Sequence, residues 1–305
     1  MKIFDAHCDV LYKIWENESL SFTEDSNLHI TFNDLNKFPG SIQCMAIFVP
    51  PEVPEPLKFD SALKMIDIFY EKIIKPYDNI KVILQKADIH KLKDHEIGVI
   101  LTLEGCDVIG SDLIKLKTLY RLGVRAVGLT WNYANAVADG VLEERGGGLT
   151  NFGKDVIREL NTLDLWTDVS HLTERGFYEV IDIAKYPIAS HSNAYEICPH
   201  PRNLKDHQIR ALIEKKGVMG MNFCPSFLKE QDAGISDILK HIEHICELGG
   251  EFNVGLGSDF DGIAMTPKGI ANYGQYDNLI NELVKHYTHK QVENFCYDNF
   301  VNIFR

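Results

Sequence analysis

Residues 4–10, FDAHCDV, place three ionisable side chains at every second position near the start of the chain. Successive side chains of a β-strand point to opposite sides, so Asp5, His7 and Asp9 would share one face and apolar residues the other. A solvated edge strand would show the same alternation. A short strand that is apolar on one side also fits a buried first strand of an α/β protein, and His7 with Asp9 then form a candidate metal-binding pair.

Length and charge limit the class of protein. A chain of 305 residues with 45% hydrophobic content can bury the core of one α/β barrel or of two smaller domains. The formal net charge of -13 argues against a nucleic-acid partner. No long uncharged apolar run indicates a membrane span or a leader, and the seven Cys lack a CxxC pair, as is typical of reduced thiols. We therefore expect a cytoplasmic protein with no membrane partner.

Eight short β-rich runs recur along the chain, each followed by a segment of helical character, such as residues 59–74 and 235–250. Eight alternating strands and helices predict a parallel (β/α)8 TIM-type barrel, with residues 1–305 forming a single domain. A doubly wound open sheet is the competing architecture, but no Gly-rich nucleotide motif follows the first run. The runs are KIFDAHCDV, SIQCMAIFV, IGVILTLEG, VRAVGLTWN, LWTDVSH, YPIASHSN, GVMGMNFC and FNVGLGSDF.

Residues that commonly bind metals lie at the ends of five of these runs. Taken singly, each has an ordinary explanation as a helix cap, a buried histidine or a polar turn. Because the carboxyl ends of barrel strands meet at one face, their joint occurrence predicts a site for zinc or a similar divalent ion. Three His and two carboxylates exceed the ligands of a single catalytic zinc, so we expect two ions bridged by a carboxylate. These five residues are His7, Asp9, Glu104, His171 and His191, and Asp259 and Asp261 lie at the end of the last run.

The motifs DAHCD, LTLEG, DVSH, ASHSNAYEICPHPRN and GLGSDFDG, in this order, resemble the membrane (renal) dipeptidase family of dinuclear zinc peptidases. The resemblance extends to the end of the chain. It implies two Zn²⁺ per chain, bridged by Glu104 and by a water or hydroxide. One ion would take His7, Asp9 and Glu104, and the other Glu104, His171 and His191. Attachment to a membrane is not implied, because the sequence shows neither a leader nor an apolar tail.

The resemblance also implies how dipeptides would be hydrolysed. Two ions lower the pKa of bound water from 15.7 toward about 7 and so supply a hydroxide. Asp259 would move a proton to the leaving nitrogen, whereas Asp261 serves either catalysis or the turn of its loop. Arg202 would bind the free C-terminal carboxylate, although on sequence alone a surface arginine beside Pro201 is the favoured interpretation and only the resemblance reverses it. Asp5, deeper on the first strand, would orient a metal ligand.

One position departs from the family pattern. Where animal members carry a substrate-contacting His, this chain has Trp131, which can donate one hydrogen bond but cannot take up a proton. Stabilisation of the oxyanion would then be weaker or would come from Asn132 or Tyr133, and the substrate preference would shift.

Two other functions remain open at this point. A related barrel hydrolase could act on another amide or a lactone, but such enzymes generally begin with HxH rather than the HxD of this chain. A non-catalytic metal-binding barrel is the second alternative, against which the complete set of presumed ligands argues. The resemblance is compatible with a homodimer and with D-residues at the C-terminal side of the substrate.

Overall fold

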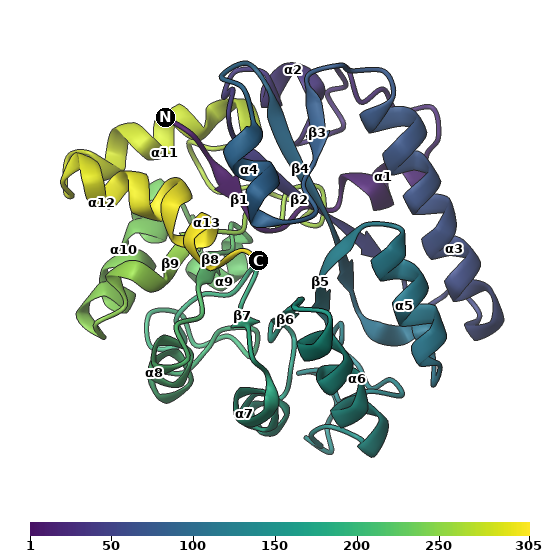
Figure 1. The fold of residues 1–305 in the computed structure, drawn as a ribbon. Coiled ribbons are helices and arrows are strands. Elements are labelled where there is room, and N and C mark those ends of the chain that lie inside the picture. Colours follow the sequence, from purple (N-terminus) through teal and green to yellow (C-terminus); the bar gives the residue numbers. More distant parts are fainter.

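The computed structural model describes residues 1–305, which fold as a barrel of parallel strands surrounded by helices (Figure 1). Neighbouring strands follow the order β7-β6-β5-β4-β2-β1-β9-β8, and a parallel bridge between Ala189 and Met219 joins the two ends. The (β/α)8 prediction is thereby confirmed. The barrel strands are β1 (Phe4–Asp5), β2 (Ile42–Phe48), β4 (Ile97–Glu104), β5 (Val124–Gly128), β6 (Trp166–Asp168), β7 (Pro187–Ile188), β8 (Met219–Met221) and β9 (Val254–Leu256).

A ninth strand, β3 (Ile80–Val82), was not predicted from the sequence. It pairs with the first three residues of β4, whereas β5 joins β4 only from Leu101 onward. The long β4 therefore has two partners on the same side in succession. Because β3 is three residues long and carries an exposed Lys81, its sequence gives little periodic signal.

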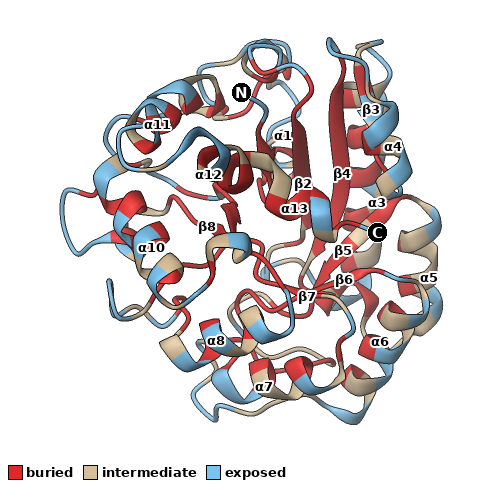
Figure 2. Cartoon of the chain, turned by 60° about the vertical axis from the view of Figure 1, so that its left-hand side comes forward, coloured by how far each residue is buried: buried red, intermediate tan, exposed pale blue.

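The helices lie outside the barrel, where Figure 2 shows their buried sides turned inward and their exposed sides outward. Gly123 and Gly249, which follow α5 and α10, have φ angles of +115° and +91° that suit glycine at a helix end. The α-helices are α1 (Val10–Glu16), α2 (Phe32–Leu35), α3 (Glu55–Ile68), α4 (Lys86–Lys91), α5 (Leu113–Arg121), α6 (Asn151–Thr162), α7 (Glu174–Ile183), α8 (Asp206–Glu214), α9 (Pro225–Leu228), α10 (Ile235–Glu247), α11 (Tyr276–Leu283), α12 (His289–Glu293) and α13 (Asn299–Ile303). Shorter turns are 3-10 helical at Cys106–Ile109, Glu251–Asn253 and Tyr273–Gln275 and π-helical at Phe69–Ile74 and Asn294–Asp298.

The first strand is shorter than the alternation in residues 4–10 predicted. β1 ends at Asp5, Cys8 forms an isolated bridge with Phe260, and α1 begins at Val10 with Asp9 as its N-cap residue. The chain must turn from the barrel interior to the outer helix layer within a few residues, which shortens the regular strand. The ionisable residues of this segment are nevertheless buried, as expected.

Aromatic side chains fill the end of the barrel where the strands begin. The ring of Phe300, from α13, stacks on Phe4 of β1 at a centroid distance of 5.1 Å and lies 5.8 Å from Trp166 of β6. Phe304 packs against the edge of the same Trp166 ring. The C-terminal helix thus closes one end of the barrel, which leaves the opposite end for the polar cluster.

Two findings bear on the environment of the protein. No helix combines the length and the apolar composition needed to cross a membrane. All seven cysteines are free thiols, and five of them are buried.

Candidate active site

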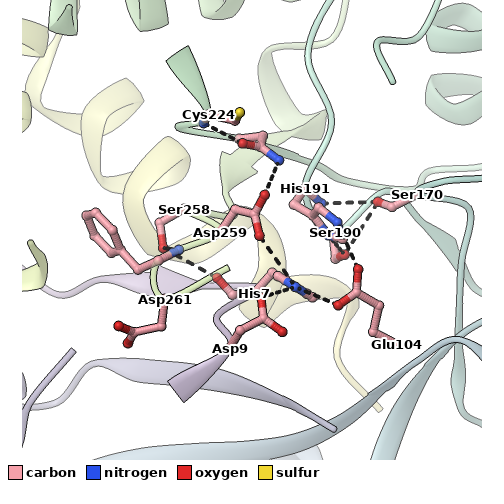
Figure 3. A network of polar contacts seen from close by, with 12 residues as sticks. His7, Asp9, Glu104, Ser170, Ser190, His191, Cys224, Ser258, Asp259 and Asp261 are labelled. Carbon is pink, nitrogen blue, oxygen red and sulfur yellow. Dashed lines mark hydrogen bonds and ion pairs between the residues drawn. The ribbon is translucent and has the colours of Figure 1, made fainter. Parts of the chain in front are cut away.

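A cavity of about 270 Å³ opens at the carboxyl ends of the barrel strands. Three of the predicted ligands, Asp9, Glu104 and His171, line it, while His7 and His191 are buried at 3% and 1% exposure. Figure 3 shows His7, Asp9, Glu104, His191 and Asp259 pointing toward one another. The structure therefore brings the sequence-predicted ligands together. Tyr12, Phe48, Trp131, Asn132, Arg202, Cys224, Phe227, Asp259, Gly262, Ile263 and Ala264 complete the lining.

Glu104 lies between two sets of ligand atoms. Its Oε2 is 3.4 Å from Nε2 of His7, which in turn is 3.2 Å from Oδ2 of Asp9. Its Oε1 is 2.9 Å from Nε2 of His171 and 3.6 Å from Nε2 of His191. Ligands of one zinc ion are separated by roughly 3–3.5 Å when each lies at about 2.1 Å from the metal. The spacing of both sets fits a divalent ion on either side of Glu104.

The protonation states of His171, His191 and Glu104 also fit a metal. In the absence of an ion, His7 and Asp9 favour their protonated forms: although burial opposes ionisation of His7, Glu104 and Asp9 raise its pKa well above the ordinary value, and burial raises the pKa of Asp9. Burial lowers the pKa of His171 to about 4 and that of His191 well below its ordinary value, so both imidazoles are neutral at pH 7. Although burial opposes its ionisation, the neighbouring His7 and His171 hold the pKa of Glu104 well below the usual range. Oδ1 of Asp9 is buried without a hydrogen-bond partner. Neutral imidazoles and ionised carboxylates are the forms that bind metals.

Asp259 borders the cluster, with Oδ1 3.9 Å from Nε2 of His7. Its other oxygen, Oδ2, accepts a hydrogen bond of 2.9 Å from the side-chain amide of Asn222. Burial raises the pKa of Asp259 to about 7. A carboxyl group with this pKa can take up and release a proton near neutral pH.

Two other carboxylates hold the backbone rather than the cluster. Asp261 accepts hydrogen bonds from the amides of His29 and Ile30, at 2.7 and 3.2 Å. This geometry corresponds to the structural alternative for Asp261, in which it fixes a loop. Asp5 accepts from both the amide and the hydroxyl of Ser258 and contacts His7 only through its backbone amide, so it does not orient the His7 ring.

Arg202 is 5% exposed, so the interpretation of a surface arginine is wrong. Nη2 donates to the backbone carbonyl of His191 at 3.3 Å, and the guanidinium carbon lies 5.6 Å from the centre of the Phe227 ring. Nε is buried without a partner. A cavity-lining guanidinium with an unpaired donor is suited to bind an anionic group of a ligand.

The three residues of the Trp131 loop take different places. Trp131 lines the cavity and packs against Phe48 at a centroid distance of 5.4 Å. Asn132 also lines it, but its Oδ1 lies 2.8 Å from Nδ1 of His171, so it contacts a predicted metal ligand. Tyr133 is 51% exposed and does not line the cavity, so the structure does not bring it to the predicted oxyanion position.

Sequence reasoning missed a second layer of polar residues. Asn222 bonds Asp259, and Ser190 together with Asp168 lies behind His191. Their position at strand ends was the only available signal, since Asp168 precedes His171 by three residues in DVSH and Asn222 directly follows β8 within the GVMGMNFC run.

The barrel and its cluster of nitrogen and oxygen ligands define a metal-dependent hydrolase. Residues 1–305 match the family described as membrane dipeptidase (peptidase family M19). The chain therefore belongs to the membrane dipeptidase family, and its activity is that of a metal-dependent dipeptidase.

Relatives and solved structures agree with this assignment. An uncharacterized dipeptidase of Schizosaccharomyces pombe is 29% identical over all of this chain and 80% of its own length. The structure of dipeptidase AC, a metallo peptidase of family M19, superposes with a TM-score of 0.90 at 28% identity, covering 99% of this chain and 97% of that one. A metallo peptidase from Rhodobacter sphaeroides, bound to a phosphinate mimic of the dipeptide L-Ala-D-Ala, gives 0.89 at 27% identity, covering 99% and 98%.

Proposed function

We propose that this dipeptidase holds two zinc ions on either side of Glu104. The observation that carries the proposal is the division of the ligands between the two oxygens of one buried carboxylate, with His7 near Oε2 and His171 and His191 near Oε1. Zinc bound there would polarise the peptide carbonyl and lower the pKa of bound water from 15.7 to about 7.

The residues of the chain have distinct tasks in this proposal. Asp259 takes a proton at its carboxylate and delivers it to the leaving nitrogen of the peptide, because it borders the ligands and has a pKa near neutrality. Arg202 binds the free C-terminal carboxylate. Trp131, Phe48 and Phe227 form apolar walls that limit access of water to the cavity.

The substrate we propose is a dipeptide, including one with a D-residue at its C-terminal side. Two observations support this choice. The cavity of about 270 Å³ is small enough to favour short peptides. The Rhodobacter sphaeroides structure, with which this chain superposes over nearly its full length, contains a mimic of L-Ala-D-Ala.

Metal content and hydrolysis, measured together, test the proposal. We expect two zinc ions per chain by mass spectrometry, loss of dipeptide cleavage after chelation and recovery after addition of zinc. The panel contains matched dipeptides that differ only in L- or D-configuration of the second residue, with a cyclic amide and a lactone as controls. A single ion at full activity, or cleavage of the control amide or lactone in place of dipeptides, would contradict it.

Loss of the Arg202 guanidinium is expected to lower kcat/KM for dipeptides about 10- to 100-fold. Hydrogen bonds to charged groups contribute roughly 1.5–3 kcal/mol, and Arg202→Met removes those made to the substrate carboxylate. A dipeptide with a C-terminal amide lacks that charge, so its already low rate is expected to be unchanged in the variant. Arg175→Met, which alters an exposed arginine of α7, is the control. Equal losses for both substrates would exclude a carboxylate-binding role.

The compartment and the assembly state are further parts of the proposal. We place the protein in the cytoplasm, which the absence of disulfides among seven cysteines supports, since reduced thiols persist there. Fractionation of cells tests this. We also propose a homodimer, by resemblance to the family, and light scattering of the purified protein decides between one and two chains.

A further inference from the structure

A buried chain of polar groups lies directly behind the His191 imidazole. Ser190, just after β7, places its Oγ 2.7 Å from Nδ1 of His191 (Figure 3). The same Oγ lies against Oδ2 of Asp168, the last residue of β6. Asp168, Ser190 and His191 are 7%, 3% and 1% exposed. Because all three side chains are buried, their hydrogen positions are determined by the donors and acceptors of the protein and not by water.

The two oxygens of Asp168 accept hydrogen bonds from different donors. Oδ1 accepts from the backbone amides of Ser170 and Ser190, at 3.0 and 2.9 Å, and Oδ2 accepts from the Ser190 hydroxyl. A hydroxyl has one hydrogen, and a carboxylate can only accept. Because the Ser190 hydrogen is directed to Asp168, the Ser190 oxygen must accept from Nδ1 of His191.

We propose that Asp168 and Ser190 are positioning residues that keep the His191 hydrogen on Nδ1 and leave the Nε2 lone pair for a metal ion. This inference rests on the proposed zinc site. The same arrangement holds for His171, whose Nδ1 faces Oδ1 of Asn132 at 2.8 Å. With both hydrogens on Nδ1, the two Nε2 atoms, 2.8 Å apart, and Oε1 of Glu104 all present lone pairs to one another. A cation bound by these atoms would remove that repulsion.

The substitution Asp168→Asn is expected to reverse this hydrogen-bond chain with almost no change of shape. Two backbone amides face the Oδ1 position, so the carbonyl oxygen of the introduced amide must stay there and its NH₂ group must face Ser190. The Ser190 oxygen then accepts from that NH₂ group and its hydroxyl donates to His191, which moves the His191 hydrogen to Nε2. Ser170 Oγ, at 3.4 Å, is too distant to offer the Ser190 hydroxyl a good alternative. An Asp-to-Asn exchange behind a catalytic histidine selects the wrong tautomer in serine proteases.

The zinc affinities of Asp168→Asn, Ser190→Ala and the double variant, compared with that of a control variant, test the inference without relying on activity. Loss of such supporting groups lowers metal affinity about 10- to 100-fold. We expect the affinity for one of the two ions to fall by about 10-fold in Ser190→Ala and by about 100-fold in Asp168→Asn. The double variant Asp168→Asn/Ser190→Ala is expected to bind that ion more tightly than Asp168→Asn, because the misdirected hydroxyl is gone. Titration uses zinc buffers and metal mass spectrometry.

A control variant distinguishes the effect of moving the His191 hydrogen from the effect of removing a buried hydroxyl. Ser192→Ala, a buried Ser-to-Ala change at the residue that follows His191 in the sequence, is the matched control and is expected to keep the affinity of the unaltered protein. Circular dichroism verifies that each variant is folded. If the double variant binds zinc no better than Asp168→Asn, or if Asp168→Asn binds as the unaltered protein does, the inference is overturned.

Two further outcomes are kept apart by the same measurements. Failure of the unaltered protein to bind two ions would overturn the proposed function instead of this inference. If Asp168→Asn does not fold, a loss of about 10-fold in Ser190→Ala with none in Ser192→Ala supports the inference, and equal affinities contradict it.

Discussion

Glu104→Gln is expected to abolish dipeptide hydrolysis, with a loss of at least about 10³-fold in kcat/KM and of at least one ion per chain. A carboxylate offers an oxygen to each ligand set, whereas an amide offers an oxygen to one set and a nitrogen that cannot bind metal to the other. Nε2 of His7 lies 3.4 Å from Oε2, and Nε2 of His171 lies 2.9 Å from Oε1. Neither orientation of the amide would therefore give both ligand sets an oxygen. Metal content and steady-state kinetics on the same samples measure the two effects together.

A surface substitution of the same chemistry supplies the control. Glu71→Gln alters an exposed glutamate that pairs with Lys75 on the π-helical turn after α3, and both metal content and kcat/KM are expected to stay unchanged. Retention of two ions by Glu104→Gln would show that Glu104 does not bridge, even if the activity were lost for another reason.

The positions of the strands were accessible from the sequence because barrel strands alternate with helices at a regular interval. All eight barrel strands lie within the runs identified from composition and periodicity. The exceptions have physical reasons. β3 is too short to show a period, and β1 gives way to α1 because Asp9 begins a helix instead of continuing the alternation.

The ligand residues were accessible for a related reason. The carboxyl ends of the strands converge in any such barrel, so residues as distant as His7 and His191 could be placed at one site before the structure was known. The residues that contact these ligands from behind could not be identified from the sequence. The contact of Asp168 with Ser190 depends on the lateral register of β6 and β7, and that of Asn132 with His171 on the path of a long loop. Neither register nor loop path is encoded in a local pattern.

Asp259→Asn is expected to lower kcat about 10²- to 10⁴-fold, the range for loss of a general acid–base group, while both ions are retained. Asn keeps the size of the side chain and can still pair with Asn222, so the ligand cluster is expected to remain intact. Metal loss in parallel with activity would assign Asp259 to metal binding instead. One ligand atom from each of His7, Asp9 and Asp259 lies within 4.8 Å of the others, which is close enough for the three residues to share an ion.

The pH profile separates the proton-transfer role from a structural one. Asp259 must be ionised to accept a proton, so activity falls as the pH drops through its pKa. Burial raises that pKa to about 7, and bound cations would lower it from there, so we expect an acidic limb of kcat/KM with its midpoint at or below about pH 7. Asp261 is the matched comparison, because burial raises its pKa to about 7 as well, yet it holds backbone amides away from the cluster. The midpoint of the acidic limb should therefore stay unchanged in Asp261→Asn and shift in Asp259→Asn, where ionisation of metal-bound water alone would set it. An unchanged midpoint in both variants would assign the limb to another group and remove Asp259 from the proton transfer.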